Sequence, residues 1–408
     1  MPNVVDRFIR YAQIDTQSDE KTGTFPSTEK QLNLARLLAV ELEELGLEDV
    51  SVDANGYVMG SLPANVDRAV PVVGLIAHMD TSPGFSSARV SPQIIRDYDG
   101  GDIQLNAAKK IVLSPRDFPE LRQYAGQTLI TTDGTSLLGA DDKAGVAEIV
   151  AALDELVAHP EHPHGRLAIC FTPDEEIGHG ADRFDLARFG ADLAYTIDGG
   201  EIGEINYENF NAARAQIAIR GRSVHPGSAR GKMINAAEVA AEMDRMLPAS
   251  ERPQTTEGYE GFYHLLHING GVEEARLDYI LRDHDRENFE ARKQRVREVV
   301  AQVNDRYGPG TALLKIEDEY YNMSEKLSPQ MLLIKNALRA MREVGVEPKP
   351  APIRGGTDGA RLTTMGLPTP NLFTGGHNYH GRYEYVPVQS MEKAVQTIVR
   401  LVELYAEG

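Results

Sequence analysis

The sequence predicts an α/β protein in which a mostly parallel sheet is flanked by helices and a smaller domain is inserted into the larger one. Apolar strands alternate with helices over roughly the first 200 residues, which is typical of a parallel sheet. Near Phe210 the order of elements changes, and from about Tyr320 the earlier alternation resumes. A chain of 408 residues is also long for one hydrophobic core, which favours two domains.

The larger domain is predicted from three kinds of pattern. Val70–Ala77 is a near-continuous apolar run, as expected of a strand that is buried on both faces. Thr28–Gly46 is expected to be a helix, opened by a Thr28/Gln31 capping box and closed by Gly46. Lys143–Val157 has helical periodicity. Further short buried strands are expected at Leu167–Phe171 and Leu193–Ile197.

The inserted domain is predicted from the order of its elements. These are the strand Ala213–Arg220, the helix Asn235–Met246, the strands Tyr263–Ile268 and Ala275–Arg282, the helix Arg286–Arg306 and the strand Thr311–Glu317. The order β-α-β-β-α-β is that of a ferredoxin-like unit. After it come the helix Ser328–Val344, the strand Thr369–Phe373 and the helix Met391–Ala406. We therefore expect residues 1–210 and 321–408 to form the larger domain and residues 211–320 the inserted one.

The net charge, the apolar runs and the cysteine content together indicate which partners and which compartment to expect. Acidic residues outnumber basic ones by 61 to 42, a formal charge of −19, which disfavours binding to nucleic acid or to anionic membranes. No apolar run approaches the about 20 residues that span a bilayer, and the amphipathic N-terminus does not resemble a secretory signal. Cys170 is the only cysteine, so no intramolecular disulfide can form. We expect a cytoplasmic protein.

Metal-binding residue types follow three of the predicted strands. His78 and Asp80 come directly after the first buried run, Glu175 and Glu176 follow the second, and Asp198 follows the third. In open α/β sheets, ligands bind beyond the carboxyl ends of the strands. Imidazole and carboxylate donors together suit Zn²⁺ or a similar divalent ion. One such residue alone is more often structural, so the prediction of a metal site depends on their coincidence at one sheet edge.

Two further segments offer donors, and each leaves an alternative open. Asp141 and Asp142 are adjacent, just before a predicted helix, and either could reach the site. His377 and His380 lie in one Gly-rich loop, and either could be a ligand. Spacing alone does not decide between the members of each pair.

The chain also resembles a known family. The motifs that carry the resemblance are HMDTSP, TTDGTSLLGADDKAG, FTPDEEIG, AYTIDGG, HPG, IRGGTDGARL and FTGGHNYHG. They resemble the peptidase T family of the dizinc exopeptidase superfamily, over essentially the whole chain. The resemblance implies a zinc-exopeptidase-like fold with the inserted domain as a lid. It also implies a tripeptide aminopeptidase with two Zn²⁺ ions per subunit, a short peptide as substrate, and a homodimer formed through the lid.

The same resemblance implies a role for each site residue. One zinc ion is expected on His78 and Asp198, the other on Glu176 and His380, with Asp141 as the bridge between them. Glu175 is expected to be the general base for a water shared by the two ions. Asp80 is expected to accept the second ring N–H of His78 and so fix its tautomer.

Substrate contacts are expected from the inserted domain and a later loop. His225 corresponds to the lid histidine that stabilises the oxyanion in the family. Arg282 and Arg354 could each pair with the C-terminal carboxylate of the peptide, for which a guanidinium group is well shaped.

Other functions remain as alternatives. The same metal chemistry would serve a related dizinc amidohydrolase, either an N-acyl amino acid deacylase or a dipeptidase. A catalytically inactive scaffold is disfavoured because it would have no need of Glu175 and Asp80. A nucleotide-binding protein is disfavoured because the sequence has no GxGxxG or Walker-type loop.

Overall fold

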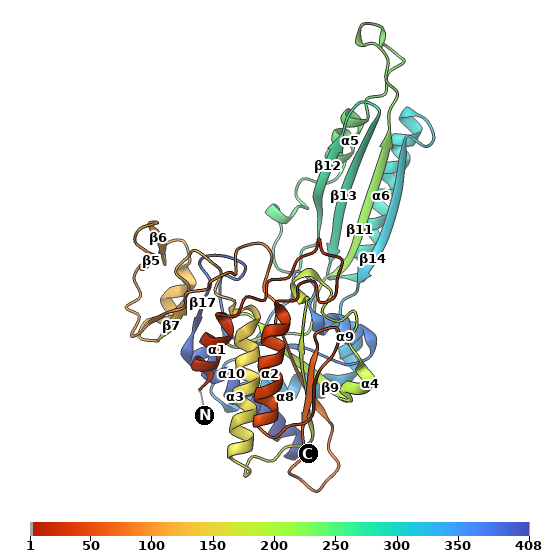
Figure 1. The fold of residues 1–408 in the computed structure, drawn as a ribbon. Helices are drawn as coiled ribbons and strands as arrows, with labels where there is room; N and C mark the ends of the chain where they lie inside the picture. The colour runs from red at the N-terminus through yellow and green to blue at the C-terminus, as the bar shows by residue number, and fades with distance from the viewer. Residues whose placement is uncertain (1–2, 408) are drawn as a thin grey trace. The chain divides into compact units, whose positions relative to one another are not determined.

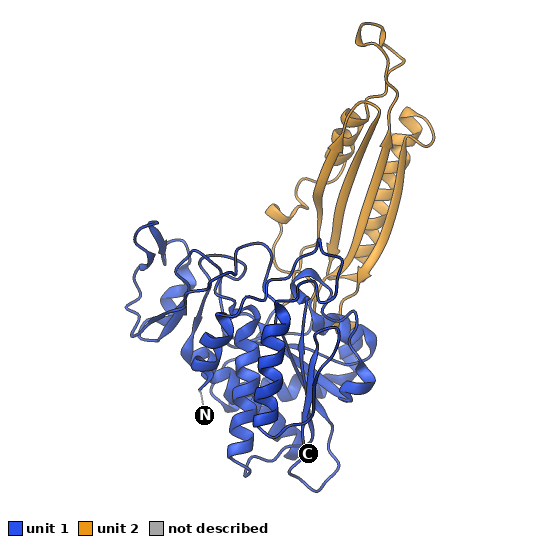
Figure 2. Cartoon of the chain, in the orientation of Figure 1, with its two compact units in different colours: residues 1–207, 326–351, 357–408 blue, residues 208–325, 352–356 orange. Residues whose placement is uncertain are grey.

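The computed structural model describes residues 3–407. The chain divides into two compact units, shown in different colours in Figure 2. Unit 1 comprises residues 1–207, 326–351 and 357–408, and unit 2 comprises residues 208–325 and 352–356. Each unit has its own sheet and its own helices.

Unit 1 is built on a mixed sheet, which within the described residues has the strand order β1-β2-β8-β3-β9-β16-β10-β15. The strands are β1 (Glu48–Val52), β2 (Val58–Leu62), β3 (Val73–His78), β8 (Leu167–Thr172), β9 (Leu193–Gly199), β10 (Glu204–Asn206), β15 (Lys349–Pro350) and β16 (Asn371–Phe373). The central strands β8, β3, β9 and β16 are parallel to one another. Antiparallel pairs occur toward the two edges, at β1/β2, β2/β8 and β10/β16.

The parallel centre explains the apolar runs in the sequence. Every residue of β3 and of β8 is buried, because helices or other strands cover both faces of the sheet. Helix α3 (Ala140–Ala158) packs on β3 and β9, and α1 (Val4–Ala12) and α10 (Val388–Glu407) pack on α3 (Figure 1). The other helices of this unit are α2 (Gln31–Glu44), α4 (Leu186–Phe189), α8 (Met331–Glu343) and α9 (Asp358–Met365). The predicted α/β fold class is confirmed.

Helix α2 begins later than the sequence predicts, and the predicted capping box is wrong. The Gln31 amide donates to Asp174 Oδ1 at 2.7 Å, and its carbonyl accepts the backbone N–H of Asp174 at 3.2 Å. A capping box would use the side-chain oxygen of Gln31 to accept the backbone N–H of Thr28, but that oxygen accepts the backbone N–H of Asp174 instead. The predicted end of the helix is correct, since Gly46 follows with φ of +84°.

Unit 1 also contains short strands that the sequence patterns did not predict. They are β4 (Gln93–Ile95), β7 (Leu129–Thr131) and β17 (Tyr385–Pro387) in one small sheet, and β5 (Ile103–Asn106) and β6 (Ile111–Leu113) in a hairpin. Each has three or four residues, too few to show a period. The short 3-10 helices of the chain are Pro119–Tyr124, Glu175–Ile177, Pro226–Ser228, Pro253–Thr255 and Ser328–Gln330.

Unit 2 has an antiparallel sheet in the order β12-β13-β11-β14. Its elements are β11 (Asn211–Arg220), α5 (Ala236–Arg245), β12 (Phe262–Gly270), β13 (Glu274–Asp283), α6 (Arg286–Tyr307) and β14 (Ala312–Tyr320), followed by α7 (Ser324–Leu327) at the passage back to unit 1. Alternate residues of β11, such as Ala215 and Ile217, join one core with Val239 of α5 and Phe289 of α6. The predicted ferredoxin-like order is therefore present.

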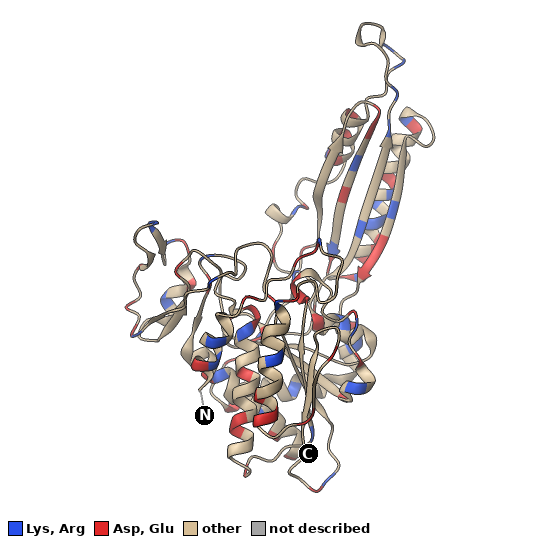
Figure 3. Cartoon of the chain, viewed as in Figure 1, with Lys and Arg blue, Asp and Glu red and all other residues tan. Residues whose placement is uncertain are grey.

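Charged residues of both signs are interspersed along the helices rather than segregated (Figure 3). On α6, for example, Glu290 lies 2.7 Å from Lys293 and 3.7 Å from Arg286. Among residues 3–407, no helix combines the length and the apolar character needed to cross a lipid bilayer.

Candidate metal centre

The three strands that the sequence singled out end side by side. His78 is the last residue of β3 and is in register with Thr172, the last residue of β8. Glu175 and Glu176 begin the 3-10 turn just after β8, and Asp198 lies near the end of β9. Because β8, β3 and β9 are parallel neighbours, their carboxyl ends bring these side chains to one edge of the sheet.

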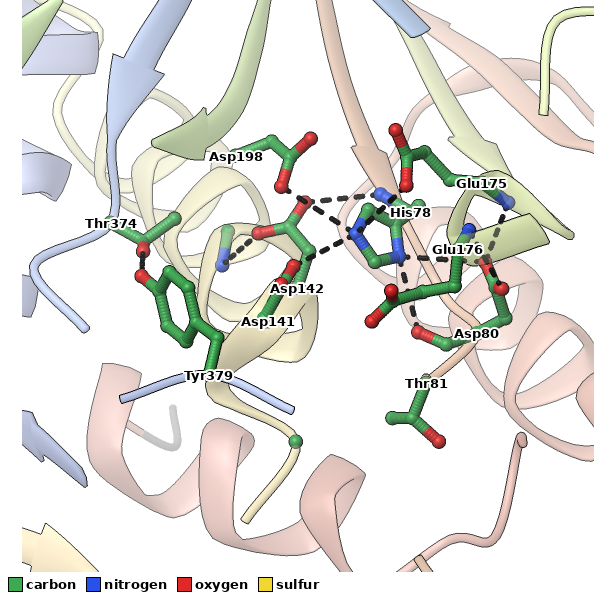
Figure 4. A network of polar contacts seen from close by, with 12 residues as sticks. His78, Asp80, Thr81, Asp141, Asp142, Glu175, Glu176, Asp198, Thr374 and Tyr379 are labelled. Carbon is green, nitrogen blue, oxygen red and sulfur yellow. Dashed lines mark hydrogen bonds and ion pairs between the residues drawn. The ribbon is translucent and has the colours of Figure 1, made fainter. Parts of the chain in front are cut away.

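Two carboxylates lie close to His78. Its Nε2 lies 3.0 Å from Asp141 Oδ1 and 3.5 Å from Asp198 Oδ1 (Figure 4). All three side chains are mostly buried, with His78 only 2% exposed. This group is able to hold a metal ion.

A second group of donors gathers around His380. The His380 Nε2 lies 2.9 Å from Asp141 Oδ2 and 3.0 Å from Glu176 Oε2. His380 is the exposed member, with half of its side chain open to solvent. Within residues 3–407, these two groups are the sets of three or more potential ligands whose donor atoms converge, and Asp141 belongs to both.

The structure distinguishes Asp141 from Asp142. Asp141 directs one oxygen toward each histidine, whereas Asp142 is fully buried behind the cluster. Asp142 Oδ2 accepts the backbone N–H of His78 at 3.1 Å, and Oδ1 accepts that of Gly145 at 3.3 Å. Position 145 must be glycine, because a Cβ atom there would lie 1.8 Å from the carbonyl oxygen of Ile197.

The structure also distinguishes His380 from His377. The His377 Nε2 is 2.6 Å from the Tyr124 hydroxyl, and its ring stacks on Tyr385 with centroids 4.9 Å apart. Burial lowers the pKa of His377 to about 4. His377 therefore belongs to an aromatic network beside the cluster, and His380 contributes the imidazole inside it.

Asp80 makes backbone contacts that the sequence did not predict, in addition to lying beside the ring of His78. Its carboxylate accepts the backbone N–H groups of Glu175 and Glu176, at 2.9 and 3.2 Å. The His78 Nδ1 lies 3.1 Å from the Asp80 carbonyl oxygen and 3.4 Å from its carboxylate, so the backbone carbonyl is the nearer acceptor. Asp80 is completely buried and ties the end of β3 to the turn after β8.

The cluster has more carboxylates than its imidazoles can balance. Burial raises the pKa of Glu175 well above its usual range and that of Asp198 to about 6. Hydrogen bonds to Asp141 and Glu176 raise the pKa of His380 to about 11. Burial raises the pKa of Asp141, but its hydrogen bonds with His380 and His78 outweigh burial and lower it. Divalent cations at this position would compensate the excess negative charge.

Two acidic residues near the cluster escaped the sequence analysis. Asp174 accepts the backbone N–H of Ser27 at 2.6 Å as well as the Gln31 amide. Glu384 accepts three backbone N–H groups of the turn that carries Asp141. A sequence signal did exist for Glu384, since it is an acid between the aromatic and apolar residues of Tyr383–Pro387.

The three predicted substrate contacts lie in unit 2. His225 is exposed, and its Nδ1 accepts the backbone N–H of Gly227 at 3.1 Å. Arg282 is largely buried, with its guanidinium carbon 4.9 Å from the centre of the Tyr320 ring. Arg354 already donates to the carbonyl oxygens of Gly258 and Glu260, at 2.7 and 3.0 Å.

The fold and the donor cluster together define a metal-dependent hydrolase of the α/β class. The family model "Peptidase family M20/M25/M40" matches residues 137–404. The chain belongs to this family of peptidases, and within it to the peptidase T family, as its relatives show. Peptidase T of Halothermothrix orenii is 58% identical over 406 residues, which cover 100% of both chains. Peptidase T of Geobacillus kaustophilus is 57% identical over 404 residues, 99% of this chain and 98% of the relative.

Solved structures share the fold over nearly the whole chain. The aminopeptidase PepT of Bacillus cereus aligns with a TM-score of 0.78 at 24% identity, covering 99% of this chain and 98% of the other. A tripeptidase of Staphylococcus aureus aligns with a TM-score of 0.79 at 22% identity, covering 100% and 98%. A Bacillus subtilis protein described as a dinuclear metal-binding peptidase of the M20 family aligns at 0.68 and 15% identity, covering 99% and 97%.

Proposed function

We propose that this peptidase is a two-zinc aminopeptidase that releases the N-terminal residue of tripeptides. The observation that carries the proposal is the pair of donor groups sharing Asp141, with Glu175 beside them. The names of the full-length relatives and of the structures with the same fold support the same activity.

The donor atoms fit zinc. Zn²⁺ prefers imidazole nitrogen and carboxylate oxygen in sites of four or five ligands, and each group supplies three such donors. We assign His78 and Asp198 to one ion, Glu176 and His380 to the other, and Asp141 to both. Glu176 Oε1 is buried and has no hydrogen-bond partner among the described residues, as expected of an oxygen that would bind a cation.

Glu175 and Glu176 are neighbours in the chain but would have different roles, Glu176 as a metal ligand and Glu175 as a general base. Zinc in such a site supplies Lewis acidity, which acidifies water and polarises a carbonyl group. Glu176 is engaged with His380, whereas Glu175 stands 4.0 Å from the nearest nitrogen of His78 and is free to face a water molecule. Glu175 would take the proton of the attacking water and pass it to the leaving amine. Asp80 holds the backbone of both glutamates and so sets which way each side chain points.

Arg282 is the candidate receptor for the C-terminal carboxylate of the peptide. Its Nε and Nη1 are buried and lack hydrogen-bond partners within the part of the chain that the structure describes. Buried N–H groups of a guanidinium that lack acceptors are costly, and a carboxylate is a strong, charge-assisted acceptor for such groups. Arg354 is a weaker candidate, because both of its terminal nitrogens already donate to backbone or hydroxyl oxygens of Thr256, Gly258 and Glu260. His225 remains the candidate for stabilising the oxyanion.

Replacing Arg282 by methionine is expected to raise KM for tripeptides by roughly 30-fold or more, since losing one partner of a buried charge pair costs at least about 2 kcal/mol. The informative comparison uses a tripeptide with a free C-terminus and the same peptide with a C-terminal amide. Wild type should prefer the free carboxylate, and the Arg282→Met variant should not. Equal preference in the two proteins would remove Arg282 from substrate binding. Arg354→Met serves as the matched control and should keep the wild-type preference.

A metal count combined with a substrate panel tests the activity itself. The purified chain should bind two zinc ions per subunit and hydrolyse tripeptides with a free N-terminus faster than dipeptides or tetrapeptides. It should not hydrolyse N-acetyl amino acids. Cleavage of N-acetyl amino acids would establish a deacylase instead, and a preference for dipeptides would establish a dipeptidase.

We also propose that the protein is a cytoplasmic homodimer formed through unit 2. β12 and β14 are the edges of the unit 2 sheet, and β12 carries the exposed side chain of Ile268. An edge strand can pair with a second copy of itself, which supports a homodimer formed through this unit, measurable by sedimentation of the full chain. The single, buried cysteine fits a cytoplasmic enzyme, and the charge of −19 disfavours nucleic acid and anionic membranes as partners.

A further inference from the structure

Glu384 is a buried carboxylate that holds an irregular turn. Its side chain is 1% exposed. Oε2 accepts the backbone N–H groups of Leu138 and Gly139, at 2.6 and 2.9 Å, and Oε1 accepts that of Asp141 at 3.1 Å. One side chain therefore satisfies three amides that lie where α3 begins.

Helix α3 itself offers no acceptors for the backbone N–H groups of the turn that Glu384 contacts. Amides at a helix N-terminus have no partner within the helix, so they need an acceptor from elsewhere. Gly139 is left-handed, with φ of +79°, and Asp141 and Asp142 have backbone angles outside the helical range. The direction of the Asp141 side chain is therefore not set by helical geometry.

Glu384 also belongs to the loop that carries His380. The base of this loop is closed by two backbone hydrogen bonds between His377 and Tyr385, at 2.9 and 3.1 Å. From this closed loop, Glu384 holds the backbone of Asp141 and His380 contacts its carboxylate at 2.9 Å. Asp141 is thereby held at two points by residues 243 and 239 positions away in the chain.

We propose that Glu384 is a positioning residue, which orients the Asp141 carboxylate so that each of its oxygens faces one of the two donor groups. The proposal rests on the assignment of Asp141 as the shared ligand. Carboxylates that orient a metal ligand typically change metal affinity or activity by about 10- to 100-fold when they are lost. Because Asp141 serves both groups, loss of Glu384 should weaken both metal positions together.

The test compares Glu384→Gln with the same substitution at a buried acid that belongs to neither donor group. Glu41 is a suitable control, since it is buried on α2 and accepts hydrogen bonds from Arg7 and Tyr11. Metal-free full-length wild type, Glu384→Gln and Glu41→Gln would each be titrated with Co²⁺, following the visible spectrum, and with Zn²⁺ against a competing chelator. Thermal unfolding of the metal-free proteins would be measured in parallel.

The expected result is a 10- to 100-fold loss of affinity for both ions in Glu384→Gln, with an altered Co²⁺ spectrum. Glu41→Gln should lose thermal stability but keep wild-type affinity and spectrum. Wild-type metal affinity and spectrum in Glu384→Gln would overturn the positioning role and leave a structural one. Should Glu384→Gln fail to fold, Glu384→Asp takes its place in the same titration, because the shorter acid cannot reach all three amides; wild-type affinity there would equally overturn the proposal.

Failure of the proposed function has a different signature. If wild type itself binds fewer than two ions, the two-metal assignment fails before any variant is compared. If wild type binds two ions and the Glu384 variants match it, only the role of Glu384 is lost.

Discussion

Replacing Glu175 by glutamine is expected to lower kcat by roughly 10²- to 10⁴-fold, the range that a general base contributes. Glutamine has nearly the same shape and keeps the hydrogen bond from its backbone N–H to Asp80, so the turn after β8 should not move. Glutamine cannot accept the proton of the attacking water at neutral pH. The measurement is kcat on a tripeptide, together with a zinc count on the same preparation.

The neighbouring residue provides the matched control for this experiment. Glu176→Gln changes the same functional group one position along, but it removes a donor that lies 3.0 Å from His380. It should lose metal, whereas Glu175→Gln should keep both ions. A Glu175→Gln enzyme that retained more than a tenth of wild-type turnover would show that the proton is taken by another group.

Replacing Asp141 by asparagine should weaken binding at both metal positions. Each Asp141 oxygen faces a different histidine, at 3.0 Å from His78 and 2.9 Å from His380, and an amide offers only one oxygen as an acceptor. We expect zinc affinity to fall by more than about 100-fold, beyond the range typical of residues that only orient a ligand. Zinc bound at equilibrium against a chelator would measure the loss.

Asp142→Asn is the control for the Asp141 variant. Asp142 accepts backbone N–H groups of His78 and Gly145 and belongs to neither donor group, so its variant should keep two ions per subunit. The opposite result, in which Asp142→Asn loses metal and Asp141→Asn retains it, would exchange the roles assigned to the two aspartates.

Several features of this protein could be read from local patterns. The continuous apolar run at Val70–Ala77 predicted a strand buried on both faces, and β3 is such a strand. The order of elements between Ala213 and Glu317 predicted a ferredoxin-like unit because each element there has a clear period. The convergence of His78, Glu176 and Asp198 could be predicted because parallel strands end at the same edge of a sheet.

Other predictions failed or stayed open because they depend on contacts that the local sequence does not contain. A capping box at Thr28 was a sound local interpretation, but Gln31 contacts Asp174, which is 143 positions away in the chain. The role of Asp80 was only partly foreseen, since its carboxylate contacts amides some 95 positions further on.

By itself, the sequence determined the class of fold and the kinds of donor atom at the sheet edge, because strand and helix periods and strand-end positions are local properties. Spacing left open the choice between Asp141 and Asp142 and between His377 and His380, and the family resemblance favoured Asp141 and His380; the tertiary structure shows that the side chains of these two lie in the donor groups. Adjacent residues in an irregular turn point in different directions, and no local period records which one faces the cluster. Here the direction follows from the backbone angles at Gly139–Asp142 and from Glu384, which lies 243 positions from the aspartate whose backbone it holds.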